Sequence, residues 1–136
     1  MLVYLQIRDF ALIDRVELEF AGGLTVVTGE TGAGKSIIVD ALLLVTGGRA
    51  GIDVIRHGAE RSEISATFDV TDDPPARAWL KEQAIDCEGE CVLRRSIAAD
   101  GRSRGYINGQ SVSLQALRAL GELLVDIHGQ HEFQSL

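Results

Sequence analysis

The chain has 136 residues, 46% of them hydrophobic, which is enough for one compact domain with a buried core. Its net charge of −7 argues against a freestanding, non-specific DNA-binding protein, although a local basic surface is compatible with it. No apolar run reaches the roughly 20 residues of a membrane-spanning helix, and the start lacks signal-peptide features, so we expect a cytoplasmic protein.

Strands are predicted at the start of the chain. Alternating hydrophobicity predicts strands at residues 3–8 and 13–20, and the glycine pair Gly22–Gly23 indicates a turn. The apolar, β-branched run at residues 24–28 predicts a buried parallel strand. A helix over residues 34–45 should follow, ended by Gly47–Gly48, because its apolar residues recur at helical spacing.

Strands and short helices continue through the second half. In chain order we expect a strand at residues 63–70, a helix at 76–83, hairpin strands at 91–97 and 102–107, a helix from the cap Ser113 to Gly121, and a buried strand at 123–127. The pattern predicts an α/β fold, with a parallel core sheet and an antiparallel β portion at its N-terminal side.

One glycine-rich motif carries the chemistry. The eight residues that fit G-x-x-x-x-G-K-[ST] are Gly29, Glu30, Thr31, Gly32, Ala33, Gly34, Lys35 and Ser36, and Ile37 follows them. Glycines let successive backbone N–H groups point at a phosphate, and the helix N-terminus adds a positive dipole end. Lys35 is expected to reach the β- and γ-phosphates, and the Ser36 hydroxyl to ligate Mg²⁺. The motif predicts a P-loop for a nucleoside triphosphate, taken as ATP.

Hydrolysis needs more than this loop. An acidic Mg²⁺ partner on another strand and a group that positions water are also required. Asp126 follows a short apolar run, but the residues after it suggest a different element, so we favour a strand-end aspartate there. Two histidines, His128 and His131, lack a third ligand at suitable spacing and receive no metal role.

The glycine loop and four further segments resemble the same known family. The strings are LQIRDFALID at residues 5–14, GLTVVTGETGAGKS at 23–36, LVTGGRA at 44–50, YINGQ at 106–110 and VDIHGQH at 125–131. Together they resemble the N-terminal head of the bacterial RecN family of DNA repair ATPases, a branch of the structural maintenance of chromosomes (SMC) group of ABC-type ATPases. The likeness spans nearly the whole chain.

The resemblance implies a split ATPase head. Residues 1–136 would be its N-terminal half, or lobe I, with a coiled coil and a C-terminal half that carries the signature motif and catalytic glutamate lying elsewhere. Gln130 would be the Mg²⁺-binding Q-loop glutamine, and Arg56 a basic residue near the nucleotide. ATP would be sandwiched between two engaged heads in the complete protein, which would act on DNA at double-strand breaks and associate with the nucleoid.

One position departs from the family pattern. Some relatives place a basic residue just after the pair that corresponds to Asp9–Phe10, near the nucleotide, whereas this chain has Ala11. Arg8 could replace that contact only if the strand geometry permits. Arg56 could equally be a solvated loop arginine.

Arginines also cluster on the expected hairpin, at Arg94, Arg95, Arg102 and Arg104. They could contact DNA phosphates or a partner lobe, or form a solvated, salt-bridged face. Two unbridged thiols are expected at Cys87 and Cys91.

Three functions fit these patterns. The leading one is an ATP-binding half-head, whose complete protein is an ATPase while this part alone binds ATP with little turnover. A freestanding P-loop enzyme such as a nucleotide kinase would need acidic residues and an arginine lid for which no convincing set is found. A nucleotide-binding interaction module is the third.

Overall fold

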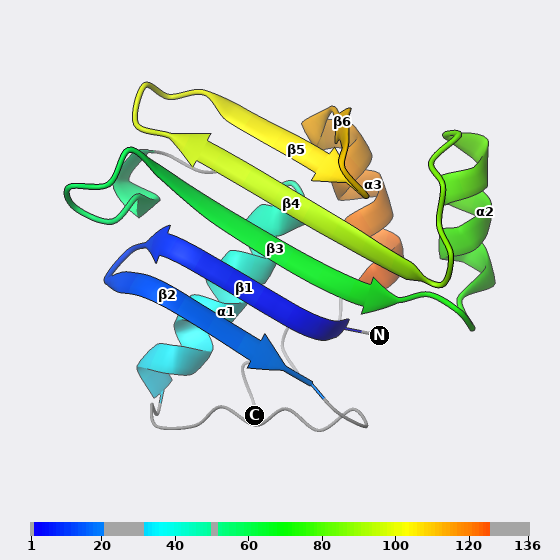
Figure 1. Ribbon diagram of the computed structural model, residues 1–136, viewed down its shortest axis with the longest axis horizontal. Helices are drawn as coiled ribbons and strands as arrows, with labels where there is room; N and C mark the ends of the chain where they lie inside the picture. The colour runs from blue at the N-terminus through cyan, green and yellow to red at the C-terminus, as the bar shows by residue number, and fades with distance from the viewer. Residues whose placement is uncertain (1, 21–31, 50–51, 126–136) are drawn as a thin grey trace.

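A single six-stranded antiparallel sheet organises the part of the chain that the computed structural model describes, residues 2–20, 32–49 and 52–125 (Figure 1). The elements in chain order are β1 (Leu2–Phe10), β2 (Ile13–Glu19), α1 (Gly32–Val45), the 3-10 helix η1 (Ile52–Val54), β3 (Arg61–Asp69), α2 (Pro74–Glu82), β4 (Glu90–Ala98), β5 (Ser103–Ile107), β6 (Gln110–Val112) and α3 (Leu114–Leu124). None of the described helices is long and apolar enough to cross a membrane.

The strands lie in the order β2-β1-β3-β4-β5-β6. Four of the five neighbouring pairs join strands that follow one another in the sequence. The exception is β1 with β3, where Leu5 lies opposite Ala66 and Ile7 opposite Ile64. The chain between these two strands includes β2 and α1, so their pairing joins segments that lie before and after the glycine motif in the sequence.

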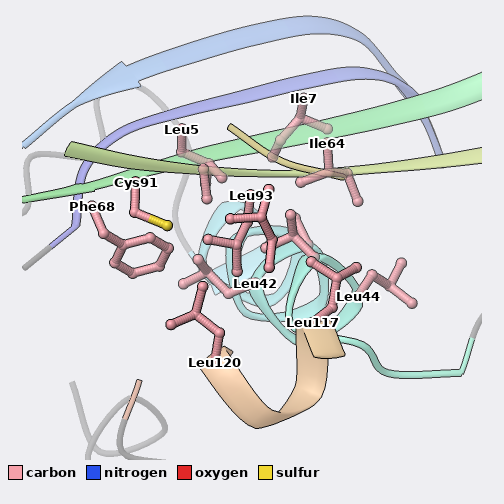
Figure 2. Packing of buried hydrophobic residues seen from close by; sticks show 14 of the residues in the cluster. Leu5, Ile7, Leu42, Leu44, Ile64, Phe68, Cys91, Leu93, Leu117 and Leu120 are labelled. Carbon is pink, nitrogen blue, oxygen red and sulfur yellow. The ribbon is translucent and has the colours of Figure 1, made fainter. Parts of the chain in front are cut away.

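The two faces of the sheet differ. Alternate residues of the central strands are buried on an inner face, which α1 and α3 cover, while α2 lies at one end of the sheet (Figure 1). Figure 2 shows side chains from the sheet meeting those of the two helices, among them Leu5, Ile7, Ile64, Phe68, Leu93, Leu42, Leu44, Leu117 and Leu120. Each such large apolar side chain contributes about 1.5–3 kcal/mol when it leaves water, so this layer fixes the helices against the sheet.

A Schellman motif ends α1. Gly47 has φ of 94°, and its N–H donates to the carbonyl of Leu44 at 3.1 Å, while the N–H of Gly48 donates to the carbonyl of Leu43 at 2.9 Å. A left-handed residue is needed at this point, which favours glycine. The predicted end of the helix at Gly47–Gly48 is confirmed.

α3 is longer than expected. Its predicted cap is confirmed, because Oγ of Ser113 accepts from the N–H of Ala116 at 3.1 Å. The helix does not stop at Gly121 but continues to Leu124, with Val125 as its C-cap, so the strand predicted at residues 123–127 is wrong for the three of its residues that the structure describes. Leu117, Leu120 and Leu124 keep helical spacing on one side, which explains the continuation. Residues 126 and 127, and the parallel strand expected at residues 24–28, lie outside the described residues.

β6 was not expected. Asn108 and Gly109, with φ of 50° and 83°, form the tight turn that pairs β6 with β5. The side-chain Oδ1 of Asn108 also accepts a hydrogen bond from the backbone N–H of Val92 at 2.8 Å, which ties the turn to β4. A strand of three residues is too short to show a period of two in the sequence.

Candidate nucleotide-binding site

The helix predicted over residues 34–45 begins two residues earlier, still inside the glycine motif. α1 starts at Gly32, and the backbone of residues 32–36 is helical. The first N–H groups of a helix have no partner within it, so this end of α1 offers donors and a positive dipole end to an anion. The motif residues Gly29, Glu30 and Thr31, and likewise Gln130, lie outside the described residues.

α1 is fixed by its buried side. Ala41, Leu42, Leu44 and Val45 are buried against the sheet, and Ile37, the first described side chain after the motif, is half-buried against the same core. Asp40 is exposed. The phosphate-binding end predicted for Lys35 and Ser36 is therefore one end of a helix that is anchored by the rest of its length.

Arg56 lies beside the turn between β1 and β2. Its N–H donates to the carbonyl of Asp9 at 2.8 Å, and Nη1 lies 3.8 Å from Oδ1 of Asp9 and 4.0 Å from Oδ1 of Asp14. The Arg56 side chain is 44% exposed, so these long ion pairs hold it weakly. Both segments that the family resemblance associates with the nucleotide, the turn around Ala11 and the loop around Arg56, thus lie side by side.

The turn itself has an uncommon backbone. Asp9 and Ala11 have φ of 51° and 54°, which few residues other than glycine adopt. The N–H of Ala11 donates to the carbonyl of Val54 at 2.7 Å, which holds the turn against η1. Arg8 does not fill the place of the missing basic residue, because it lies on the outer face of the sheet while α1 covers the inner face.

The predicted arginine cluster divides between the two faces. The guanidinium of Arg94 lies 4.2 Å from the ring centroid of Tyr106 on the outer face. Arg102 and Arg104 are exposed, and Nε of Arg102 lies 3.5 Å from Oδ2 of Asp100. Arg95 does not belong to this surface, since it is only 1% exposed and lies on the inner face. Of the four arginines that cluster on the hairpin in the sequence, Arg95 is therefore not available to an external partner.

Sequence reasoning missed the place of Arg95. Its Nε donates to Oγ of Ser103 at 2.8 Å, and its Nη1 donates to the carbonyls of Leu44 at 2.6 Å and Gly48 at 2.7 Å. A signal was present, because Arg95 lies two residues from Leu93 and two from Ile97, the apolar residues on the buried side of β4. The charge concealed that signal, since arginine is seldom fully buried.

A model of the AAA domain family matches residues 4–111 of the chain. The DNA repair protein RecN of Xylella fastidiosa (strain 9a5c) is 54% identical over 136 residues, which is 100% of this chain and 24% of that protein. RecN of Vibrio cholerae (serotype O1, strain N16961) is 46% identical over the same length, again 24% of that protein. The chain therefore spans about a quarter of the length of these curated relatives.

Solved structures share the fold. One, from work on the "structural biochemistry of ATP-driven dimerization and DNA stimulated activation of SMC ATPases", has a TM-score of 0.72 and 26% identity. The similarity covers 90% of this chain and 78% of that chain. The α/β fold of an SMC-type ATPase head, predicted from the sequence, is confirmed.

Proposed function

Because the chain belongs to the AAA domain family and is homologous along its whole length to RecN DNA repair proteins, we propose that it is the ATP-binding half of a split ATPase head. The observation that supports this most directly is the start of α1 at Gly32, within the glycine motif. A helix N-terminus at that point is what the binding of a triphosphate requires.

The motif residues divide the work. Backbone N–H groups of residues 29–37 surround the phosphates, and Lys35 neutralises the β- and γ-phosphates. The hydroxyl of Ser36 and the side-chain oxygen of Gln130 are the hard oxygen donors that Mg²⁺ prefers. Bound Mg²⁺ supplies charge neutralisation of the phosphate oxygens. The long ion pairs of Arg56 with Asp9 and Asp14 support a role in which Arg56 exchanges those carboxylates for the nucleotide.

Turnover requires parts beyond this chain. Residues 1–136 form lobe I, and the acidic strand and signature motif of the C-terminal half complete the site. Two engaged heads then enclose ATP, and the complete protein couples this engagement to holding DNA at breaks, in the cytoplasm. The solved relative from work on ATP-driven dimerization and DNA stimulated activation supports a second head and DNA as partners.

Nucleotide binding is tested with the chain itself and a fluorescent ATP analogue. Lys35→Ala should weaken binding about tenfold or more, because charged hydrogen bonds to the phosphates are lost and about 1.4 kcal/mol corresponds to a factor of ten. Lys81→Ala, which removes the only other lysine from the exposed side of α2, is the matched control and should bind as the parent does. Equal binding by the parent and Lys35→Ala would contradict the proposal.

Division of the head is tested by ATP hydrolysis. The chain should show little turnover alone and substantial turnover once the C-terminal half is supplied. Robust hydrolysis by residues 1–136 alone, abolished by Lys35→Ala, would instead support a freestanding P-loop enzyme.

A further inference from the structure

Two arginines from other elements hold the C-terminal end of α1. Nη1 of Arg95, on β4, donates to the carbonyls of Leu44 and Gly48 at 2.6 and 2.7 Å, and Nη2 of Arg118, on α3, donates to the carbonyl of Gly47 at 3.1 Å. Helix geometry leaves the last carbonyls of a helix in need of donors, and cations interact favourably with the negative end of its dipole. We call these two side chains and three carbonyls the α1 end clamp.

Arg95 is a costly way to satisfy carbonyl groups. It is 1% exposed, and its hydrogen bonds go to uncharged oxygens, those of the two carbonyls and of Ser103. Burial lowers the pKa of the guanidinium, and the positive charge of Arg118 lowers it further. A buried charge without an acidic partner costs free energy unless its hydrogen bonds offset that cost, so the contact between Arg95 and this helix end depends on the geometry of these bonds.

The clamp sits where three elements meet without room for adjustment. A Cβ atom added to Gly47 would lie 2.9 Å from the backbone N of Arg118 and 2.9 Å from the carbonyl oxygen of Leu114. The guanidinium of Arg95 meanwhile joins β4 to α1 and to Ser103 on β5. Hydrogen bonds from the sheet and direct backbone contact with α3 thus fix the position of this helix end.

We propose that Arg95 and Arg118 are positioning residues for nucleotide binding, which set α1 along its axis so that its phosphate-binding end lies at a fixed place. The inference rests on the proposed function of the glycine motif. α1 has 14 residues and so spans about 21 Å, over which a helix packed along its length moves as one rigid element. A shift at the clamped end therefore reaches residues 32–36, where displacements of about 1 Å strongly weaken a positioned contact.

The test measures the affinity of the complete protein for a fluorescent ATP analogue, well below the unfolding transition of each variant. Arg95→Met should raise Kd roughly tenfold. Arg118→Met should raise Kd less, because it removes only one hydrogen bond of the clamp, the one to the carbonyl of Gly47. Arg95→Lys should recover part of the affinity, since an ammonium group can still donate to both carbonyls. Arg77→Met, the same change at an exposed arginine of α2, is the control and should leave Kd unchanged.

Unfolding temperatures without nucleotide separate positioning from stability. A lower unfolding temperature for Arg95→Met with a Kd equal to that of the parent would overturn the proposal. If Arg95→Met does not fold, Ser103→Ala and Arg118→Met decide, and unchanged affinity in both would overturn it. Failure of the proposed function looks different, because the parent and Lys35→Ala would then bind the analogue equally.

Discussion

At the scale of single residues, the thiol of Cys91 gives the fold a measurable dependence on pH. Cys91 is fully buried, and burial raises the pKa of its thiol from an ordinary value of 9.0 to about 12, with a smaller contribution from Cys87. Since the folded-state pKa lies above the unfolded one, the neutral thiol stabilises the fold fully below pH 9, and this contribution is lost as pH rises toward 12. Denaturant unfolding from pH 8 to pH 11 should therefore show a steep loss of stability.

Other groups titrate in the same range, so the comparison is with Cys91→Ala. That variant should be less stable at pH 8, because a buried side chain is truncated, but should lose less stability between pH 8 and pH 11. Parallel curves for the two proteins would contradict the expectation. In the folded parent, a thiol reagent at pH 8 should label the half-buried Cys87 and spare Cys91.

Neighbouring residues show what sequence could predict at this scale. Arg94 and Arg95 have the same side chain, but Arg94 stacks on Tyr106 on the outer face of the sheet, whereas Arg95 is buried on the inner face. The period of two along β4 separates them, and the apolar residues Leu93 and Ile97 identify the buried side. What the period cannot supply is the partners of Arg95, because the carbonyls of Leu44 and Gly48 come from a distant part of the chain.

At the scale of elements, the contact between α1 and α3 depends on a glycine. A Cβ atom added to Gly121 would lie 2.5 Å from Cβ of Thr46 and 2.8 Å from its Cγ2. Gly121→Ala should therefore destabilise the fold by about 1–2 kcal/mol, even though alanine favours a helix by about 1 kcal/mol over glycine. Urea unfolding measures the difference, with Gln115→Ala, at an exposed position of α3, as the near-neutral control. A gain of stability in Gly121→Ala would contradict this expectation, because it would show that the two helices shift to admit the added methyl group without loss of stability.

Local sequence patterns predicted most elements correctly, but they placed the end of α3 wrongly. Strands with clear alternation, such as β3 and β4, and the turn at Asn108–Gly109 follow from period and backbone preference. Gly121 was taken as a helix end because glycine commonly ends helices, whereas here it permits close packing against Thr46. Packing between elements distant in sequence decided that case, and no local pattern reports it.

At the scale of the whole molecule, the outer face of the sheet carries the arginines for which contact with DNA phosphates is one of the alternatives. The described helices leave this face open (Figure 1). Arg102 and Arg104 are exposed at the start of β5, the strand next to the edge strand β6. Arg102→Glu with Arg104→Glu should weaken DNA binding by the complete protein about tenfold at low salt and make it less salt-dependent, because phosphate contacts are lost. Fluorescence anisotropy with duplex DNA at several salt concentrations measures both effects.

A matched control separates a local contact from overall charge. Arg77→Glu with Lys81→Glu makes the same change of net charge on α2, where both residues are exposed. It should leave DNA binding close to that of the parent. If both double variants weaken binding equally, net charge rather than this surface explains the effect.

The pairing of β1 with β3 also sets the order in which the protein can assemble as it is synthesised. β1 and β2 leave the ribosome before the other described elements and can form a hairpin, but β1 cannot meet its second partner until the glycine motif and α1 have been made. Contacts between distant segments form slowly because a long loop must close first, whereas β3 to β6 pair with near neighbours. The pairing of β1 with β3 is thus completed late in folding, so on the proposed function we expect a nascent chain to bind nucleotide only after these two strands have paired.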